Sequence, residues 1–468
     1  MLTEFLILMK QELMLIIIIF ILLFLKLGKK EIKNVTFIHF VNVLLLINLV
    51  SGFLMSQTGS LFGDMFSTNR LLTFEKNLLN LATLIISLQS YNWLKEHKHV
   101  PEFYMLLLST LLGMFYMLSS ENLLMFYLAL ELSTIPIAAL ANFDLEKRRS
   151  SEAAFKMIIS SAFSSGLLLF GISMVYGLTG TLNFEEISNG LTSSPLSIFA
   201  FILLIAGFGF KISAVPFHLW TADVYEGSPV AVTSYLSVVS KGAILFILVS
   251  VLYKVFGTFS FEWYFILFLL SILTMIIGNL FALRQQNMKR FLAFSSIAQV
   301  GFILIGISGQ SVEGSASVIF FVLVYIFSNL AAFGVISLVS AVTGKENVDD
   351  YKGFYKTNPA LSWVLAIALF SLAGIPPTAG FFGKFFLLLA GAAKGNYLLI
   401  TIAALNMVLA LYYYLRIIKA MFMDANENPI EKIKTSWSPK LAMVICVAGI
   451  IITGLASGAY NFIYSLVK

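Results

Sequence analysis

The sequence lacks most of the residues from which cofactor sites are built. Its single cysteine, Cys446, lies in an apolar run, which excludes a disulfide framework and a cysteine-ligated iron–sulfur cluster. The four histidines form no cluster with metal-ligand spacing, and no GxGxxG motif follows a strand-like run. We therefore expect this chain to carry no redox cofactor and no metal of its own.

Charged residues are also scarce. They make up 12% of the 468 residues, whereas soluble domains contain about 25%. Hydrophobic residues account for 59%, the mean hydropathy is +0.92, and the polar segments are only short loops. The composition predicts a polytopic membrane protein, so the net charge of +6 is interpreted through membrane topology and not as a nucleic-acid-binding surface.

Apolar runs of helical length recur along the chain and predict an all-α bundle of fourteen transmembrane helices. The first run lacks a small-residue cleavage site and is followed by lysines, so we expect a retained helix and not a signal peptide. The predicted spans are 9–27, 36–55, 72–93, 101–120, 122–142, 153–178, 196–220, 229–256, 261–283, 289–309, 315–343, 359–391, 397–422 and 440–466.

Positive charge is distributed unevenly between the predicted loops. Loops after odd-numbered helices contain twenty-one Lys or Arg residues, and loops after even-numbered helices contain three. Because positively charged loops tend to stay in the cytoplasm, both termini are predicted to face the periplasm. The odd-numbered connection 221–228 has no Lys or Arg and is predicted to be a polar loop containing Asp223 and Glu226.

Four ionisable residues lie deep in the predicted spans: Glu131, Lys211, Lys241 and Lys384. Left unpaired, they would together cost about 10–14 kcal/mol on membrane-insertion scales, as much as the stability of a whole domain. We therefore expect them to be paired, hydrated or partly neutral in a site inside the bundle. The alternatives are snorkelling of Lys211 to the interface, and structural pairing of each lysine with Glu131 or with backbone carbonyls.

Two of the predicted helices are broken by proline beside a lysine. Lys211 precedes Pro216 in the seventh helix, whereas Pro376 and Pro377 precede Lys384 in the twelfth. This mirrored order predicts an inverted repeat in which helices four to eight correspond to helices nine to thirteen. The predicted organisation is three N-terminal helices in 1–100, the two repeats in 101–256 and 257–422, and a loop with the last helix in 423–468.

Other residues have weaker signals. His218 follows Pro216 closely and either joins a chain of water molecules or caps backbone groups freed by the break. Glu75 and Lys76 are interpreted as an ion pair at the membrane interface. Tyr225 and Glu226 are interpreted as contacts to a neighbouring subunit or as turn-shaping residues.

Several stretches make the chain recognisable. They are FKISAVPFHLWTADVYEGSP, SYLSVVSKGA, KRFLAFSSIAQVGF and LAGIPPTAGFFGKF. With these stretches the chain closely resembles the subunit N family of bacterial proton-pumping NADH-quinone oxidoreductase, respiratory complex I, firmly over residues 100–420. The loop DVYEGSP is the most specific piece, because sister subunits L and M and related cation/proton antiporter subunits have a different loop.

The resemblance implies a proton-translocating subunit of the membrane arm, in the inner membrane of a bacterium. Its partners would be the other membrane-arm subunits and, indirectly, the peripheral redox arm, where partner subunits hold flavin and iron–sulfur clusters and transfer electrons from NADH to quinone. By motif, the proton path of the family falls on Glu131, Lys211, Lys241 and Lys384.

The sequence departs from the family at Gln299, where histidine is common, and glutamine cannot titrate. We expect Glu131 and Lys211 to form a switch, because a carboxylate that approaches or retreats changes how strongly a buried lysine holds its proton. Two other functions remain open: a cation/proton exchanger that works without NADH, and a scaffold whose charges only lock helices together.

Overall fold

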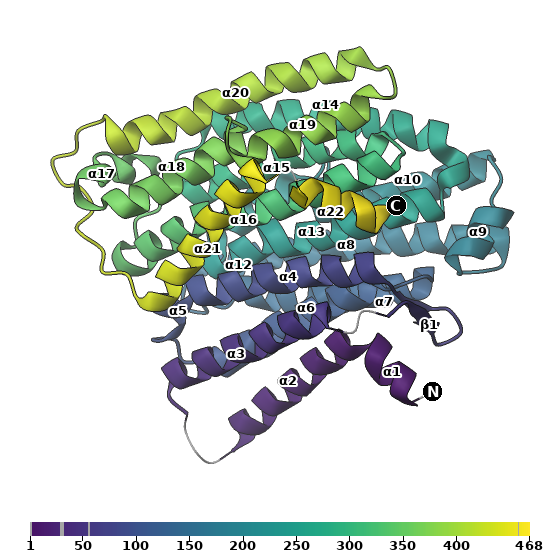
Figure 1. Cartoon of the computed structure of the whole chain (residues 1–468), viewed down its shortest axis with the longest axis horizontal. Coiled ribbons are helices and arrows are strands. Elements are labelled where there is room, and N and C mark those ends of the chain that lie inside the picture. The colour runs from purple at the N-terminus through teal and green to yellow at the C-terminus, as the bar shows by residue number, and fades with distance from the viewer. Residues whose placement is uncertain (1, 29–31, 55–56, 457) are drawn as a thin grey trace.

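The computed structural model describes residues 2–28, 32–54, 57–456 and 458–468. Most of the helices run roughly along the long axis of the molecule, and both termini lie at the same end (Figure 1). The long helices are α2 (Lys10–Leu27), α3 (Asn34–Phe53), α4 (Arg70–Gln89), α6 (Val100–Leu118), α7 (Leu123–Ala141), α8 (Arg148–Thr179), α10 (Pro195–Ile212), α13 (Lys241–Lys254), α14 (Ser260–Arg284), α15 (Met288–Ser308), α16 (Val312–Thr343), α18 (Pro359–Ala373), α19 (Ala379–Ala392), α20 (Tyr397–Phe422) and α21 (Trp437–Leu455).

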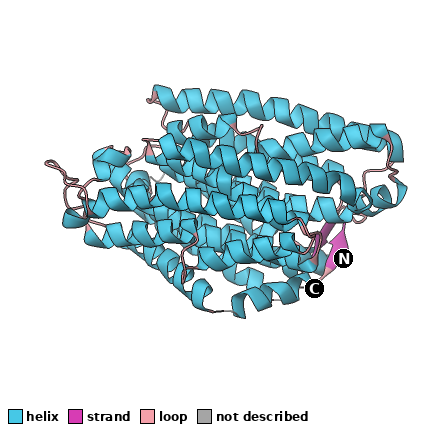
Figure 2. Ribbon diagram, turned by 90° about the horizontal axis from the view of Figure 1, so that it is seen from above, coloured by secondary structure: helices cyan, strands magenta, loops and turns pink. Residues whose placement is uncertain are grey.

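Short elements connect or extend these helices. One antiparallel hairpin, β1 (Gly59–Leu61) with β2 (Phe66–Thr68), lies at the end of the bundle near the N-terminus (Figure 2). The short helices are α1 (Leu2–Leu8), α5 (Tyr91–Leu94), α9 (Phe184–Gly190), α11 (Leu219–Gly227), α12 (Val230–Tyr235), α17 (Phe354–Thr357) and α22 (Gly458–Val467), with a π turn η1 (Leu236–Ser240) and 3-10 turns η2 (Gly257–Phe259) and η3 (Val348–Tyr351).

Twelve helices of the described residues are long and apolar enough to cross a membrane. The predicted count of fourteen goes beyond them at two places: α2, which contains three charged residues, and the pair α18 and α19, each of which is short. The predicted span 440–466 is wrong as a single helix, because α21 ends at Leu455 and α22 begins at Gly458. Of the first lysine-rich loop, Lys29 and Lys30 lie outside the described residues.

The core of the bundle is formed by α15 and α16. The apolar 18-residue stretches of these two helices are 100% and 94% buried. The peripheral helices α8, α14 and α20 leave large apolar side chains exposed, including Phe163, Phe261 and Tyr412. A broad apolar surface around a buried centre is expected of a protein whose outer helices contact lipid hydrocarbon. The predicted polytopic all-α architecture is therefore present.

Two helices are broken at the expected prolines. After α10, Ser213 adopts a left-handed backbone conformation with φ 64°, and Pro216 follows before α11 begins. After α18, Gly374 has φ 86°, and Pro376 and Pro377 precede α19. Each break leaves carbonyls of the preceding helix without intrahelical partners and available to side chains.

Candidate functional site

The lysine at the first break lies beside the predicted carboxylate without forming an ion pair with it. Lys211, in the last turn of α10, donates a hydrogen bond from Nζ to Thr134 Oγ1 at 2.8 Å. Glu131 is one turn before Thr134 on α7, and its charge acts on Lys211. The Glu131 Oε1 atom is buried and has no hydrogen-bond partner among the described residues. Lys211 is therefore bonded to α7 within the bundle, one turn from Glu131 and without a direct ion pair to it.

A small cavity extends from Lys211 toward the next lysine. Its lining includes Thr134, Lys211 and Ser240, the residue directly before Lys241. The volume of this cavity is about 20 Å³, and about 10–15 Å³ is enough for one water molecule. A single water molecule can therefore bind beside Lys211, next to Ser240.

Lys241 begins α13 directly after the π turn η1 and is 3% exposed. Its Nζ donates to Ser296 Oγ of α15 at 2.7 Å and lies 5.5 Å from the centre of the Tyr225 ring. π turns often occur at functional positions because they shift the side chains that follow. No carboxylate of the described residues pairs with Lys241 within 4 Å, so this lysine is held by a hydroxyl and a ring face.

Lys384 on α19 is 1% exposed and uses the carbonyls that the second break frees. Its Nζ donates to Leu372 O at 2.8 Å and to Ala373 O at 3.2 Å. Gln299 Nε2 donates to the same Leu372 carbonyl at 3.1 Å. Gln299 thus lies one carbonyl away from Lys384, and it lies one turn beyond Ser296 on α15.

Hydroxyls and amides fill the space around this line of lysines. Ser237 in η1 accepts from Asn329 Nδ2 at 2.8 Å and lies 3.1 Å from the Tyr325 hydroxyl. Gln299 Nε2 also lies 3.3 Å from the Tyr414 hydroxyl. Such groups can both donate and accept hydrogen bonds, which makes them suitable for passing protons along with water.

His218 lies between the first break and α11, where it is 7% exposed. Its Nδ1 has no hydrogen-bond partner among the described residues. This leaves both predicted roles open, since an unpaired ring nitrogen can accept from water or turn to a freed backbone group.

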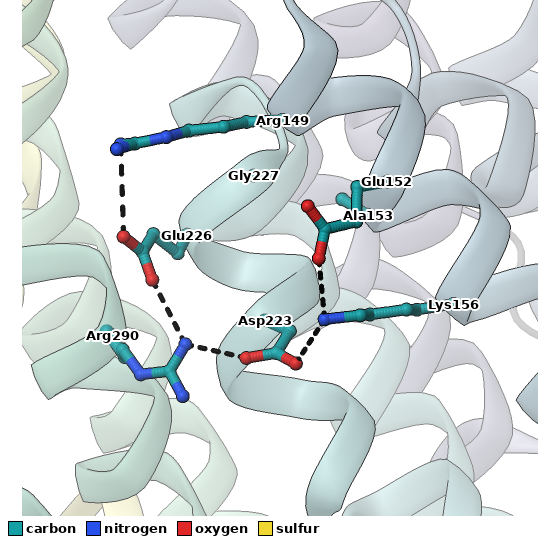
Figure 3. A pocket seen from close by; sticks show the side chains of 8 residues that line it. All are labelled: Arg149, Glu152, Ala153, Lys156, Asp223, Glu226, Gly227 and Arg290. Atoms are coloured by element: carbon teal, nitrogen blue, oxygen red, sulfur yellow. Dashed lines mark hydrogen bonds and ion pairs between the residues drawn. The ribbon is translucent and has the colours of Figure 1, made fainter.

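The predicted loop containing Asp223 and Glu226 is wrong, because both residues lie on helix α11. Arg290 of α15 donates to Asp223 at 2.6 Å and to Glu226 at 3.0 Å, and Lys156 of α8 donates to Asp223 at 2.7 Å. Figure 3 shows these side chains converging from three helices, with Arg149 on the far side of Glu226. They line a cavity of about 210 Å³.

This charge network fixes the position of α11. Burial alone would raise the pKa of Asp223, but hydrogen bonds from Lys156 and Arg290 outweigh it and hold that pKa below its usual range. The carboxylate is therefore charged at neutral pH. It anchors the second half of the broken helix, and with it Tyr225, whose ring faces Lys241.

Comparison with known proteins identifies the family. A model described as NADH:quinone oxidoreductase/Mrp antiporter, TM, matches residues 120–410. NADH-quinone oxidoreductase subunit N of Phocaeicola vulgatus is 48% identical over 426 residues, which cover 90% of each chain. Subunit N of Azobacteroides pseudotrichonymphae is 46% identical over 470 residues, covering 98% of this chain and 97% of the relative. This chain belongs to the NADH-quinone oxidoreductase subunit N family.

The subunit N fold is also shared with a solved structure. A chain of respiratory complex I from Thermus thermophilus with bound aureothin is 27% identical and superposes with a TM-score of 0.82. The match covers 96% of this chain and 97% of that chain. The resemblance to subunit N and the antiporter-like fold predicted from the sequence are confirmed.

One buried ion pair of this subunit N homologue escaped the sequence analysis. The interpretation of Glu75 and Lys76 as an interface pair is wrong, because Lys76 is 1% exposed and pairs with Glu12 of α2. The sequence contained a signal, since Glu12 and Lys76 both lie in apolar runs. What it lacked was the packing of α2 against α3 and α6, which brings Glu12 within reach of Lys76.

Proposed function

We propose that this chain is a membrane-arm subunit of NADH-quinone oxidoreductase that translocates protons across the membrane, coupled to electron transfer from NADH to quinone in other subunits. The family supports this assignment, and one observation carries it for this chain. Lys211, which is half-buried, and the buried Lys241 and Lys384 are held inside the bundle by hydroxyls and freed carbonyls, and a water-sized cavity lies beside Lys211.

The mechanism begins at the open pair of Glu131 and Lys211. When the carboxylate approaches, Lys211 keeps its proton, and when Lys211 turns to Thr134, as it does in this structure, its proton can pass to water in the cavity. Lys241 then accepts a proton from that water. Moving one charge against about 100 mV costs about 2.3 kcal/mol, which is within the range that one approaching carboxylate supplies.

The second half of the path runs from Lys241 to Lys384. Ser296 holds Lys241, and Gln299 lies one turn further along α15 and shares a carbonyl with Lys384. Gln299 cannot gain or lose a proton at neutral pH, so it positions water and Lys384 without carrying charge. Lys384 exchanges its proton with the outer side.

The orientation proposed for the chain follows from charge. Twenty-one basic residues in one set of loops against three in the other support an orientation with the basic loops in the cytoplasm and both termini in the periplasm of a bacterial inner membrane. Both termini lie at one end of the bundle, as this topology requires (Figure 1). Flavin, iron–sulfur clusters and quinone are assigned to partner subunits.

Lys211→Ala tests this function. In membranes in which a native gel shows an assembled complex, NADH–quinone electron transfer and proton uptake into vesicles are measured together. We expect either electron transfer or proton uptake to fall sharply, because the first relay group is gone. Lys352→Ala, at an exposed lysine paired with Asp349 in the loop after α16, is the matched control and keeps both. Wild-type rates and stoichiometry in Lys211→Ala would refute the role of Lys211, and failed assembly alone would favour the scaffold alternative.

A further inference from the structure

A second group of buried charged and polar side chains lies on α2, α3 and α4. None of these helices carries Lys211, Lys241 or Lys384. Lys76 Nζ of α4 lies 2.5 Å from Glu12 Oε1 of α2, and both side chains are 1% exposed. Lys76 also donates to Ser119 Oγ at 2.6 Å and lies 5.2 Å from the centre of the Phe66 ring. A buried ion pair is a poor stabiliser, because desolvation offsets most of its Coulomb energy. Its presence in an apolar bundle therefore points to a function.

Amides extend this pair into the bundle. Gln11 Nε2 donates to Asn77 Oδ1 at 2.8 Å, and a Cβ at Gly52 of α3 would lie 2.1 Å from that same oxygen. Glycine at this position therefore makes room for the two amides to meet. One turn away on α3, Asn48 is 0% exposed, and neither its Nδ2 nor its Oδ1 has a hydrogen-bond partner among the described residues. Buried amides without protein partners bind water.

Polar side chains continue along one face of α4. Lys76, Asn80, Thr83 and Ser87 follow one another at one-turn spacing, and all are buried. From Lys76 to Ser87 this face extends for about 16 Å, half the thickness of a membrane core. Thr83 lies against the hydroxyl of Tyr235, the last residue of α12, which is followed directly by η1 and then by Lys241. The polar face thus reaches the helix that carries the central lysine.

At its other end the group reaches the surface. Glu75 adjoins Lys76 in sequence and feels the charge of Lys254. Lys254 is 48% exposed and lies 2.5 Å from Glu121 Oε1. Glu75, Lys254 and Glu121 therefore place ionisable side chains on the side of the buried pair that faces the end of the bundle.

We propose that the Glu12–Lys76 pair is a second proton-exchange site of this subunit. The amides of α3 and α4 bind the water that hydrates the site. The site lies between the helix that carries Lys241 and the end of the bundle where the N-terminus lies. The proposal rests on the proposed function, because it needs protons to reach Lys241. The pair takes up one proton on the Glu12 carboxylate, which becomes a carboxylic acid beside the Lys76 ammonium. It then releases one proton to water at the Glu75 end, which restores the carboxylate.

The double variant Glu12→Gln with Lys76→Gln tests the site. It removes both charges together, so no unpaired charge stays buried, and a merely structural pair would tolerate it. In the assembled complex we expect proton uptake per NADH oxidised to fall. The matched control is Lys26→Gln with Glu102→Gln, which removes a partly exposed ion pair at the opposite end of α2 and leaves uptake unchanged. Wild-type uptake in Glu12→Gln/Lys76→Gln would overturn the proposal.

A second measurement uses the wild-type complex and does not depend on folding of a variant. Dicyclohexylcarbodiimide reacts with carboxylic acids in apolar surroundings, so mass spectrometry of the Glu12 peptide reports its protonation. We expect the Glu12 adduct to increase when NADH starts turnover, whereas no adduct in either condition would overturn the proposal. If Lys211→Ala impairs pumping and Glu12 gives no response, only this inference fails. If Lys211→Ala has no effect, the proposed role of Lys211 fails instead.

Discussion

Thr134→Val is the sharpest test of the switch at the first break. Thr134 accepts the hydrogen bond from Lys211 at 2.8 Å, and it donates its own proton to Leu130 O at 2.7 Å. Valine has nearly the same shape and removes only the hydroxyl, so the packing of α7 is preserved. The substitution removes the partner that keeps Lys211 away from Glu131.

The size of the effect follows from the lost bond. A hydrogen bond to a charged group contributes about 1.5–3 kcal/mol, and about 1.4 kcal/mol changes a population tenfold. Without the hydroxyl, the population of Lys211 paired with Glu131 should rise by about 10- to 150-fold relative to the open arrangement. Because the paired lysine holds its proton, release into the cavity becomes rarer.

The assay is NADH–quinone turnover with proton uptake in membranes containing assembled complex. Thr134→Val should slow both, and Thr134→Ser, which keeps the hydroxyl, should retain both. If Thr134→Val and Thr134→Ser both behave as the wild type does, the contact seen between Lys211 and Thr134 takes no part in proton release, and the switch must lie elsewhere.

Two further predictions concern the path and the topology. The Gln299→Leu complex should assemble but show lower proton uptake, because the substitution removes the amide that shares the Leu372 carbonyl with Lys384. The Gln299→His complex should retain uptake. Equal uptake in the wild type and in both variants would exclude Gln299 from the path. In intact cells, an impermeant thiol reagent should label Ser193→Cys and not Asp349→Cys. Both residues are exposed, but Ser193 follows the sixth predicted helix, on the periplasmic side, and Asp349 follows the eleventh, on the cytoplasmic side. The reverse labelling would show that the topology is inverted.

The sequence was enough to predict the class of protein, its four central ionisable residues and both helix breaks. These are local signals, because a charge or a proline in an apolar run is costly at that position whatever packs around it. The comparisons confirm the family, while the roles of Glu131, Lys211, Lys241 and Lys384 stay predictions that the variants above test. The fourteen-helix count, the inverted repeat and the division into 1–100, 101–256, 257–422 and 423–468 also stay predictions.

Only the tertiary structure decided which groups each charge contacts. Thr134 and Ser296 are uncharged residues in apolar helices, and such residues give almost no sequence signal because a serine or threonine can bond to its own helix. The Glu12–Lys76 pair joins residues on different helices, and it forms because α2 packs against α3 and α6, which bring it within side-chain reach of α4. Partners that are distant in the chain are chosen by helix packing, which no local pattern of residues contains.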